Sequence, residues 1–419
     1  MWCIIIAMIM FILGRQPEIG AAELAAVFSQ EPRMIGSHCA VLDITRELAL
    51  QFAPRLGGSV KIAEVVDTIN QNDNSISTLA STLFSGVEGK ITLGVSDYSQ
   101  RATRHNTVKL AKQIARVLQN SNSVRLVPIT DTTLSSATVE HNGLGHGNIK
   151  KCELIFAAIH NKWVVARTIY VQNIESYTMR DRKRPYRDAR NGMLPPKLAQ
   201  IIINLALGAT DPKCQSNNSY LLDPFCGTGV ILQEAILMGI SNCYGTDLNP
   251  QMSEYTTKNI TWINEFISRR NNTANLTKCR FETADATEFN WCNQANTNNI
   301  NLATVATETY LGRPYTVEPN LNELKENIKN CDTILGKFIN NLAPQLTAGA
   351  GLCLAVPAWF VHDKIYHLNC FNSQALQSLG LKDLHSNHLI YHRDGQIVGR
   401  ELIVLQKSTI ANLLQIKNK

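Results

Sequence analysis

The residues best suited to chemistry form a glycine-rich loop, Asp223-Pro-Phe-Cys-Gly-Thr-Gly229. It joins an apolar strand, predicted over Tyr220–Leu222, to a helix predicted over Val230–Met238. A loop in this position lets backbone amides approach a ligand at the carboxyl end of the strand, which is typical of nucleotide-type cofactor sites. Within the loop, the predicted cofactor contacts are Asp223, Phe225, Gly227 and Gly229.

Acidic residues follow the next strands of the chain at regular intervals. Asp247 ends a strand predicted over Cys243–Thr246, where a carboxylate can accept hydrogen bonds from both ribose hydroxyls. Asp285 follows the strand Arg280–Thr283, in a position to bind an adenine edge. A fourth strand, Leu302–Ala306, ends at Thr307-Glu308-Thr309-Tyr310. These spacings fit repeated βα units in a mostly parallel sheet.

The end of the chain predicts how this sheet is completed. Gly351–Phe360 reads as a fifth strand, and Asp394-Gly395 is a turn signal between the strand-like segments His388–Arg393 and Arg400–Gln406. The predicted fold class is therefore α/β, with a Rossmann-like, mostly parallel sheet that includes an antiparallel last strand.

The amino-terminal part predicts a different, α+β organisation. An apolar strand over Met1–Leu13 precedes a helix over Ala21–Phe28, and a second strand and helix follow by residue 52. Met1–Leu13 lacks a basic flank and is too short to span a bilayer, which takes about 20 apolar residues. A buried strand is the preferred interpretation, and a cytoplasmic protein without a membrane segment is expected.

Basic residues gather in two places. In a helix predicted over Arg101–Asn120, three of them lie opposite the apolar face, which suits either phosphate binding or ordinary solvation. From Tyr177 to Lys197, seven basic residues face two acidic ones, a local excess of five in a whole-chain net charge of +6. Arginine dominates this predicted interdomain connector, and its planar fork suits phosphate. The predicted RNA-binding residues are Lys109, Lys112, Arg116, Arg182, Lys183, Arg184 and Arg187.

Length and composition narrow the class of protein further. A chain of 419 residues with 44% hydrophobic content has room for two or three domains. Its eleven cysteines are scattered without a CxxC pair, which argues against a disulfide framework and a cysteine zinc site. His141 and His146 read as solvated residues of a glycine-rich turn, so no metal is expected.

The loop, together with Asp247-Leu-Asn-Pro250, resembles the signature of THUMP-containing, S-adenosylmethionine-dependent RNA methyltransferases, especially the tRNA guanosine-N2 methyltransferases acting at position 10. Phe11-Ile-Leu-Gly-Arg-Gln-Pro-Glu18 and Glu23-Leu24 resemble the ferredoxin-like domain that opens those chains. The resemblance implies a ferredoxin-like domain over residues 1–60, a THUMP-like RNA-binding domain over 61–175, a basic connector over 176–197 and a class I methyltransferase domain over 198–419.

The resemblance also assigns roles to single residues. Asp223, Gly227 and Gly229 would line the methionine and sugar part of S-adenosylmethionine, Asp247 would bind its ribose and Asp285 its adenine. The family's Asp-Pro-Pro-Tyr motif is replaced here by Thr307-Glu308-Thr309-Tyr310. Glu308 would then accept from the target amino group and Tyr310 would stack on the flipped base, which makes these two the predicted catalytic residues. Cys226 is expected to pack rather than act as a nucleophile.

The expected activity is methyl transfer from S-adenosylmethionine to an exocyclic base nitrogen of RNA, above all guanosine N2 in tRNA. Two alternatives stay open: an RNA-binding module with a degenerate, non-catalytic methyltransferase domain, and a DNA amino-methyltransferase. The expected partner is tRNA or another structured RNA. Some relatives need a small activating protein subunit, so a requirement for one is also left open, as is the oligomeric state.

Overall fold

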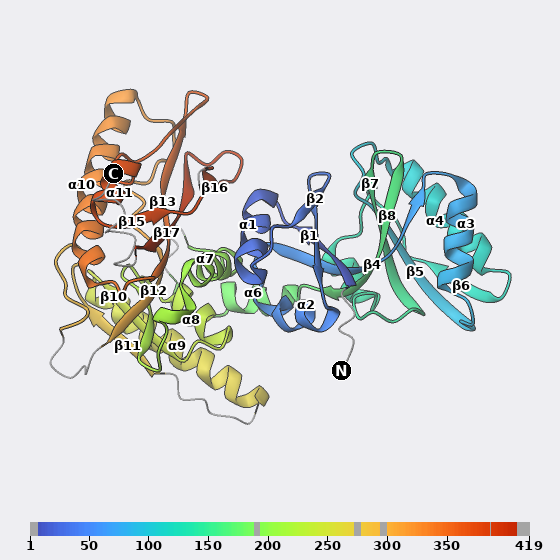
Figure 1. The fold of residues 1–419 in the computed structure, drawn as a ribbon, viewed down its shortest axis with the longest axis horizontal. Helices are drawn as coiled ribbons and strands as arrows, with labels where there is room; N and C mark the ends of the chain where they lie inside the picture. Colours follow the sequence, from blue (N-terminus) through green and yellow to red (C-terminus); the bar gives the residue numbers. More distant parts are fainter. Residues whose placement is uncertain (1–6, 188–192, 272–277, 294–299, 386, 409–419) are drawn as a thin grey trace. The chain divides into compact units, whose positions relative to one another are not determined.

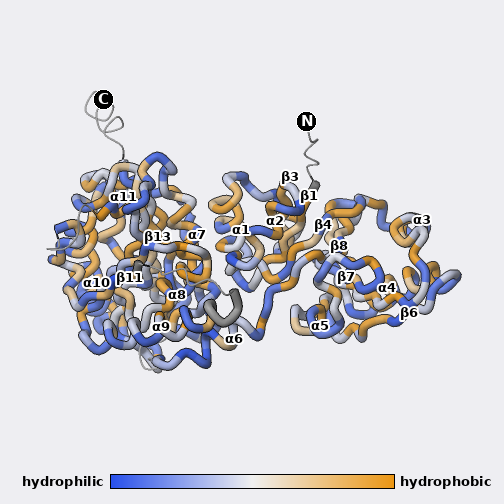
Figure 2. Tube along the Cα trace, turned by 90° about the horizontal axis from the view of Figure 1, so that it is seen from below, coloured by the Kyte–Doolittle hydropathy of each residue, from blue (hydrophilic) through white to orange (hydrophobic). Residues whose placement is uncertain are grey.

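The computed structural model describes residues 7–187, 193–271, 278–293, 300–385 and 387–408. The chain divides into two compact units (Figure 1). The amino-terminal unit comprises Met1–Ala25 and Gln30–Thr178, and the carboxy-terminal unit comprises Ala26–Ser29 and Met179–Lys419. Apolar segments gather inside each of them (Figure 2). The first six residues of the strand expected from Met1 lie outside the described residues.

The first part of the amino-terminal unit has the chain order βαββαβ. Its elements are β1 (Ala7–Leu13), α1 (Pro17–Phe28), β2 (Arg33–Ile35), β3 (Cys39–Ile44), α2 (Arg46–Phe52) and β4 (Ser59–Asn70). The strands pair antiparallel in the order β2-β3-β1-β4, which is the ferredoxin-like arrangement. The strand β4 continues past residue 60, where it also pairs with β8 (Lys162–Val171) on its other edge.

The rest of this unit extends the same sheet. Its elements are α3 (Asp73–Leu83), β5 (Gly89–Asp97), α4 (Arg104–Leu118), β6 (Asn122–Leu126), α5 (Ser136–His141), β7 (Lys151–Ile159) and β8 (Lys162–Val171). The order continues β4-β8-β7-β5-β6, so one eight-stranded sheet crosses the expected limit at residue 60. The division at that residue stays a prediction.

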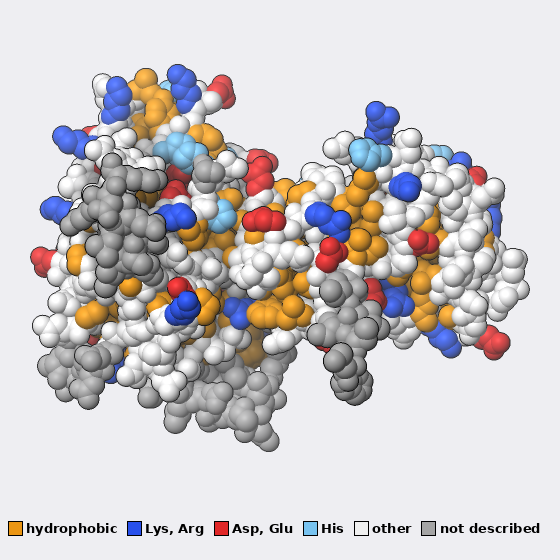
Figure 3. All heavy atoms as spheres, in the orientation of Figure 1, with side chains coloured by type: hydrophobic (Ala, Val, Ile, Leu, Met, Phe, Trp, Pro, Cys, Tyr) orange, Lys and Arg blue, Asp and Glu red, His pale blue; other side chains and the backbone are white. Residues whose placement is uncertain are grey.

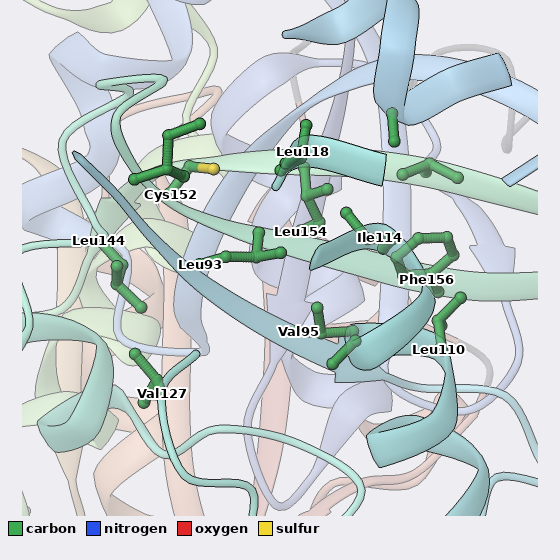
Figure 4. Packing of buried hydrophobic residues seen from close by; sticks show 14 of the residues in the cluster. Leu93, Val95, Leu110, Ile114, Leu118, Val127, Leu144, Cys152, Leu154 and Phe156 are labelled. Carbon is green, nitrogen blue, oxygen red and sulfur yellow. The ribbon is translucent and has the colours of Figure 1, made fainter. Parts of the chain in front are cut away.

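The helix α4 packs its apolar side on this sheet. Leu110, Ile114 and Leu118 lie in one buried cluster with Leu93 of β5 and Leu154 of β7 (Figure 4). The helix begins at a capping residue, because the Thr103 Oγ1 accepts a hydrogen bond from the backbone N–H of Asn106 at 3.2 Å. Burial of one side leaves the other side of α4 in solvent.

The division between the two units falls within the helix α6 (Ile174–Arg182), which extends into the segment predicted to be the connector. The further helices of the carboxy-terminal unit are α7 (Pro196–Ala209), α8 (Val230–Leu237), α9 (Pro250–Asn271), α10 (Leu321–Leu342) and α11 (Ser373–Ser378). Its strands are β9 (Ser219–Asp223), β10 (Asn242–Asp247), β11 (Lys278–Thr283), β12 (Asn301–Glu308), β13 (Gly351–Val361), β14 (Lys364–Tyr366), β15 (Leu381–Asp383), β16 (Leu389–Tyr391) and β17 (Val398–Lys407). In the part of the chain that the structure describes, 3₁₀ turns lie at Ala53–Arg55, Pro212–Cys214 and Ala343–Gln345.

The sheet of this unit has the strand order β11-β10-β9-β12-β13-β17-β15. The pairs from β11 to β13 are parallel, and β17 runs antiparallel between β13 and β15. The helix α10 covers one face, where Phe338 and Leu342 pack with Leu222 and Leu354, and α7, α8 and α9 pack against strands of the same sheet. The predicted α/β class, with a mostly parallel sheet and an antiparallel strand near its end, is confirmed.

Candidate active site

The strand order of this sheet reverses between β9 and β12. The chain passes outward from β9 to β10 and β11, and then returns to the other side of β9 with β12. In open α/β sheets, ligands bind beyond the carboxyl ends of the strands at such a switch point. Asp223 ends β9, Asp247 ends β10 and Glu308 ends β12, so these three predicted site residues lie at one edge of the sheet.

The loop after β9 is held open by two glycines in the left-handed region. Gly227 has φ +50° and Gly229 has φ +81°. A Cβ at Gly229 would lie 2.8 Å from a methyl carbon of Thr256, whereas one at Gly227 would meet nothing within 4 Å. Gly229 is therefore needed for packing on α9, and Gly227 borders open space that a ligand can enter.

Asp223 is 1% exposed and has few polar contacts. Its Oδ1 accepts hydrogen bonds from the Thr307 hydroxyl at 2.6 Å and from the Phe225 backbone N–H at 3.4 Å. Burial raises the pKa of Asp223 to about 8; these hydrogen bonds oppose the shift and nearby carboxylates add to it. A buried carboxyl of this kind suits a ligand that brings a positive charge, as the sulfonium and ammonium groups of S-adenosylmethionine do.

Asp247 joins the loop to the neighbouring strand end. Its Oδ2 accepts from the backbone N–H of Gly227 at 2.9 Å, and its Oδ1 accepts from that of Asn249 at 2.9 Å. The carboxylate is half-buried and lies beside the open space at Gly227. Each oxygen keeps capacity for a second hydrogen bond, so the residue fits a ribose diol.

A backbone hydrogen bond connects the segment of Asp285, after β11, to Asp247 at the end of β10. The Ala284 backbone N–H donates to the Asp247 carbonyl at 2.9 Å, and Asp285 Oδ1 accepts from both the backbone N–H and the hydroxyl of Thr287 at 2.8 Å. Directly after Asp247 in the sequence, the Leu248 side chain is 70% exposed, so it is accessible to a ligand at this strand end.

Two residues of the loop turn toward the protein interior. The Phe225 ring packs edge-on against Phe338 of α10, with ring centroids 4.9 Å apart, so its side chain supports the loop from below. Cys226 is buried, and burial raises the pKa of its thiol well above the ordinary range. A buried, protonated thiol is a poor nucleophile, in agreement with the predicted packing role.

Glu308 is paired with an arginine that sequence reasoning missed. The Arg400 Nε on β17 donates to Glu308 Oε1, and both side chains are largely buried. Burial raises the pKa of Glu308, and the charge and hydrogen bond of Arg400 oppose that shift. The pair orients one carboxylate oxygen. Two residues further on, Tyr310 is 43% exposed, so its ring is available for stacking.

The predicted connector is fastened to the cofactor loop. Asn259 of α9 exchanges hydrogen bonds with the backbone of Tyr186, accepting from its N–H and donating to its carbonyl, both at 3.0 Å. The same Asn259 amide donates to the carbonyl of Thr228 in the loop at 2.9 Å. The Tyr186 ring stacks on Tyr255 at 4.5 Å. The segment predicted as a basic, RNA-binding connector thus also supports the glycine loop.

The structure disagrees with the prediction that Arg184 faces RNA. Arg184 is 3% exposed, and its Nε and Nη2 atoms have no hydrogen-bond partner among the residues that the structure describes. Burial lowers the pKa of Arg184, and the negative charge of Asp181 is the largest effect that opposes this shift. Nearby, Arg180 donates to the buried Glu234 of α8 at 2.7 Å. The ion pair with Glu234 holds Arg180 in the interior, and the charge of Glu234 also acts on Arg184.

The other predicted RNA-binding residues are exposed. In the carboxy-terminal unit these are Arg182, Lys183 and Arg187, and in the amino-terminal unit they are Lys109, Lys112 and Arg116, on the solvent side of α4. On the face drawn in Figure 3, basic side chains are dispersed and do not form one patch. Their role in RNA binding stays a prediction. No helix in the described part of the chain has the length and apolar character needed to cross a membrane.

Comparisons with known proteins agree with this geometry. Residues 184–317 match the family model described as the RMKL-like methyltransferase domain. Over 260 residues, the chain is 26% identical to the tRNA (guanine(10)-N2)-dimethyltransferase of Methanothermobacter thermautotrophicus, covering 60% of this chain and 68% of that protein.

Among solved structures, TrmN from Thermus thermophilus is similar over 96% of this chain and 99% of its own, with 14% identity and a TM-score of 0.50. At that identity the likeness shows the fold alone. The matches together confirm the resemblance to THUMP-type RNA methyltransferases that the motifs indicate. The chain is an S-adenosylmethionine-dependent methyltransferase, and its residues 184–317 match the RMKL-like methyltransferase domain.

Proposed function

We propose that the enzyme methylates the exocyclic N2 of a guanosine in tRNA. The observation that carries this proposal is the pairing of a cofactor loop on β9 with Glu308 and the exposed Tyr310 at the end of the adjacent strand β12. The curated relative, which acts on guanine 10 of tRNA, supports the choice of atom and substrate. A tRNA substrate agrees with the cytoplasmic location predicted from the sequence.

When bound, S-adenosylmethionine supplies an electrophilic methyl group. Asp223, Gly227 and Gly229 would hold its methionine end, and Asp247 and Asp285 its ribose and adenine. Tyr310 would stack on the base that has left the helix, a step that enzymes acting on bases require. This placement fixes the amino nitrogen in line with the methyl group, and positioning of that kind supplies much of the rate.

Glu308 would accept a hydrogen bond from the amino group and take up its proton as the new bond to carbon forms. The Arg400 contact at Oε1 leaves Oε2 as the proposed acceptor. Because burial raises the pKa of Glu308, its carboxylate is a stronger base than one in water. The bond between the methyl carbon and the sulfonium sulfur would break at the same time, and the sulfur would keep its electron pair as a neutral thioether. The nitrogen would gain a methyl group and lose a proton, so its charge would be unchanged.

We further propose that the exposed cations bind the phosphate backbone of the substrate. Arg182, Lys183 and Arg187 lie in the segment that supports the cofactor loop, and Lys109, Lys112 and Arg116 lie within residues 61–175, the predicted THUMP-like domain. Contacts of this kind position the RNA without reading its sequence.

The decisive experiment measures methyl incorporation from labelled S-adenosylmethionine into unmodified tRNA transcripts, followed by mass spectrometry of the nucleosides. We expect N2-methylguanosine from the wild type and none from Asp223→Ala. Transfer to duplex DNA in preference to tRNA would overturn the proposal. Cofactor and tRNA binding without transfer, both for the chain alone and with added cell extract, would favour a non-catalytic RNA-binding module. Transfer only with extract would indicate an activating subunit.

A further inference from the structure

Three potential metal ligands converge at the antiparallel side of the carboxy-terminal sheet. His367 follows β14, His388 precedes β16, and Glu401 lies on β17. One ligand atom from each lies within 4.8 Å of the others. The His367 Nδ1 is 2.7 Å from Glu401 Oε2, and the His388 Nδ1 contacts Glu401 Oε1. Within the ranges that the structure describes, no other group of three such residues comes together.

The orientation of the two imidazoles is specific. Their rings are stacked, with centroids 4.3 Å apart and an angle of 28° between the planes, so that both present Nδ1 to one carboxylate. Glu401 is buried, whereas the side chain of His388 is 61% exposed. One side of the cluster is thus fixed by the protein interior and the other is open to water.

We propose that His367, His388 and Glu401 bind one divalent transition-metal ion of the zinc class. Two imidazole nitrogens and a carboxylate oxygen are common zinc ligands, and Mg²⁺ and Ca²⁺ prefer sites built only from oxygen. The exposed side at His388 leaves room for a water molecule as the fourth ligand of a tetrahedron. The alternative is a metal-free cluster in which two neutral imidazoles donate Nδ1–H to Glu401.

The ion would join segments that backbone pairing holds weakly. Among the described strands, the three-residue β14 pairs with β13, and the three-residue β16 pairs with β17. Strands this short are marginal by themselves. A metal bound by residues flanking both would fasten them to β17, the strand from which Arg400 reaches Glu308. The proposed role is to stabilise this side of the methyltransferase sheet.

The test is Zn²⁺ binding to the full chain after removal of metal with a chelator, measured by competition with a chromophoric ligand. The variants are His367→Ala and the exposed His388→Ala. The matched control is His362→Ala, which removes an exposed histidine between β13 and β14 that is not part of the cluster. We expect one equivalent bound by the wild type and the control, and at least about 100-fold weaker binding by the two variants. Loss of a residue that merely supports a ligand already costs about 10- to 100-fold.

Co²⁺ substitution separates this site from cysteine binding. We expect visible bands of a tetrahedral nitrogen and oxygen site that His388→Ala abolishes, without the strong near-ultraviolet band of a thiolate ligand. Zn²⁺ should also raise the melting temperature of wild type and control but not of His388→Ala. Equal affinity in wild type and His388→Ala, or no Zn²⁺ binding by a folded wild type, would overturn the proposal and assign the cluster to hydrogen bonding.

Discussion

Asp247 should contribute directly to the affinity for the cofactor. It faces the open space at Gly227, and its carboxylate can make two charge-assisted hydrogen bonds with ribose. We expect Asp247→Ala to weaken S-adenosylmethionine binding by about 1.5–3 kcal/mol, or roughly 10- to 150-fold, in titration calorimetry. Asp247→Asn keeps the shape and should lose less. An affinity unchanged in Asp247→Ala would remove this residue from the cofactor site.

The raised pKa of Asp223 predicts that the affinity for S-adenosylmethionine depends on pH. Its pKa of about 8 in the protein means that the carboxyl is largely protonated at pH 6. A cationic ligand binds the ionised form better, so affinity should rise as the pH rises from 6 to 8, by up to about tenfold per unit, and level off above 8. The amino group of the cofactor titrates in part of this range, so Asp223→Asn is the control. A variant with the same slope as the wild type would contradict the assignment.

The pair of Glu308 and Arg400 predicts a shift in the pH dependence of turnover. Arg400 lowers the pKa of Glu308, so Arg400→Gln should move the acid limb of the kcat profile to higher pH. Glu308→Gln should reduce kcat by about 10²- to 10⁴-fold and leave cofactor affinity unchanged. Single-turnover methylation across a pH series measures both effects. An unmoved acid limb in Arg400→Gln would mean that Glu308 does not take up the proton.

Asp247, Asp223 and the pair of Glu308 and Arg400 show which features of single residues could be predicted from the sequence and which could not. The acids at the strand ends follow from local spacing, because each directly ends a recognisable strand. The partner of Glu308 lies 92 positions away on an antiparallel strand, and no local pattern indicates such a pair. The burial of Arg184 could not be predicted for a similar reason, because a run of like charges is typical of a solvated segment and its buried acidic neighbour Glu234 lies 50 residues further along the chain.

At the level of elements, the connector should contribute to RNA binding through its exposed side only. Replacing Arg182, Lys183 and Arg187 with glutamate should weaken tRNA binding and reduce the slope of log K against log salt by about 2–3, close to 0.9 for each lost phosphate contact. The matched control reverses the exposed Lys325, Lys329 and Lys337 of α10. Equal slopes for the two triple variants would make the connector a plain support for the cofactor loop.

The elements themselves were predictable to different degrees. Alternating strands and helices with turn signals identify the parallel sheet, its closing antiparallel strand and the helix α4, whose termini differ by a few residues from the prediction. The continuity of β4 across residue 60 was not predictable, because pairing on both edges of one long strand depends on partners more than 90 residues apart. The helical part of the connector was missed because Pro185, Gly192, Pro195 and Pro196 predict an irregular segment. All four lie after Arg182, where α6 ends, so they leave the preceding residues free to form a helix.

At the scale of the whole molecule, the two units have separate sheets and separate cores, which predicts two thermal transitions. The proposed cofactor site lies wholly in the carboxy-terminal unit. Ligand at 100 times its Kd stabilises the state that binds it by about 2.7 kcal/mol, so S-adenosylmethionine should raise only that unit's transition, by roughly 5–11 °C. Calorimetry measures the transitions, and hydrogen exchange followed by mass spectrometry identifies the unit that unfolds in each of them. Asp247→Ala, which lacks the ribose contact, should show a smaller shift. A single transition that moves as one would show instead that the units unfold cooperatively.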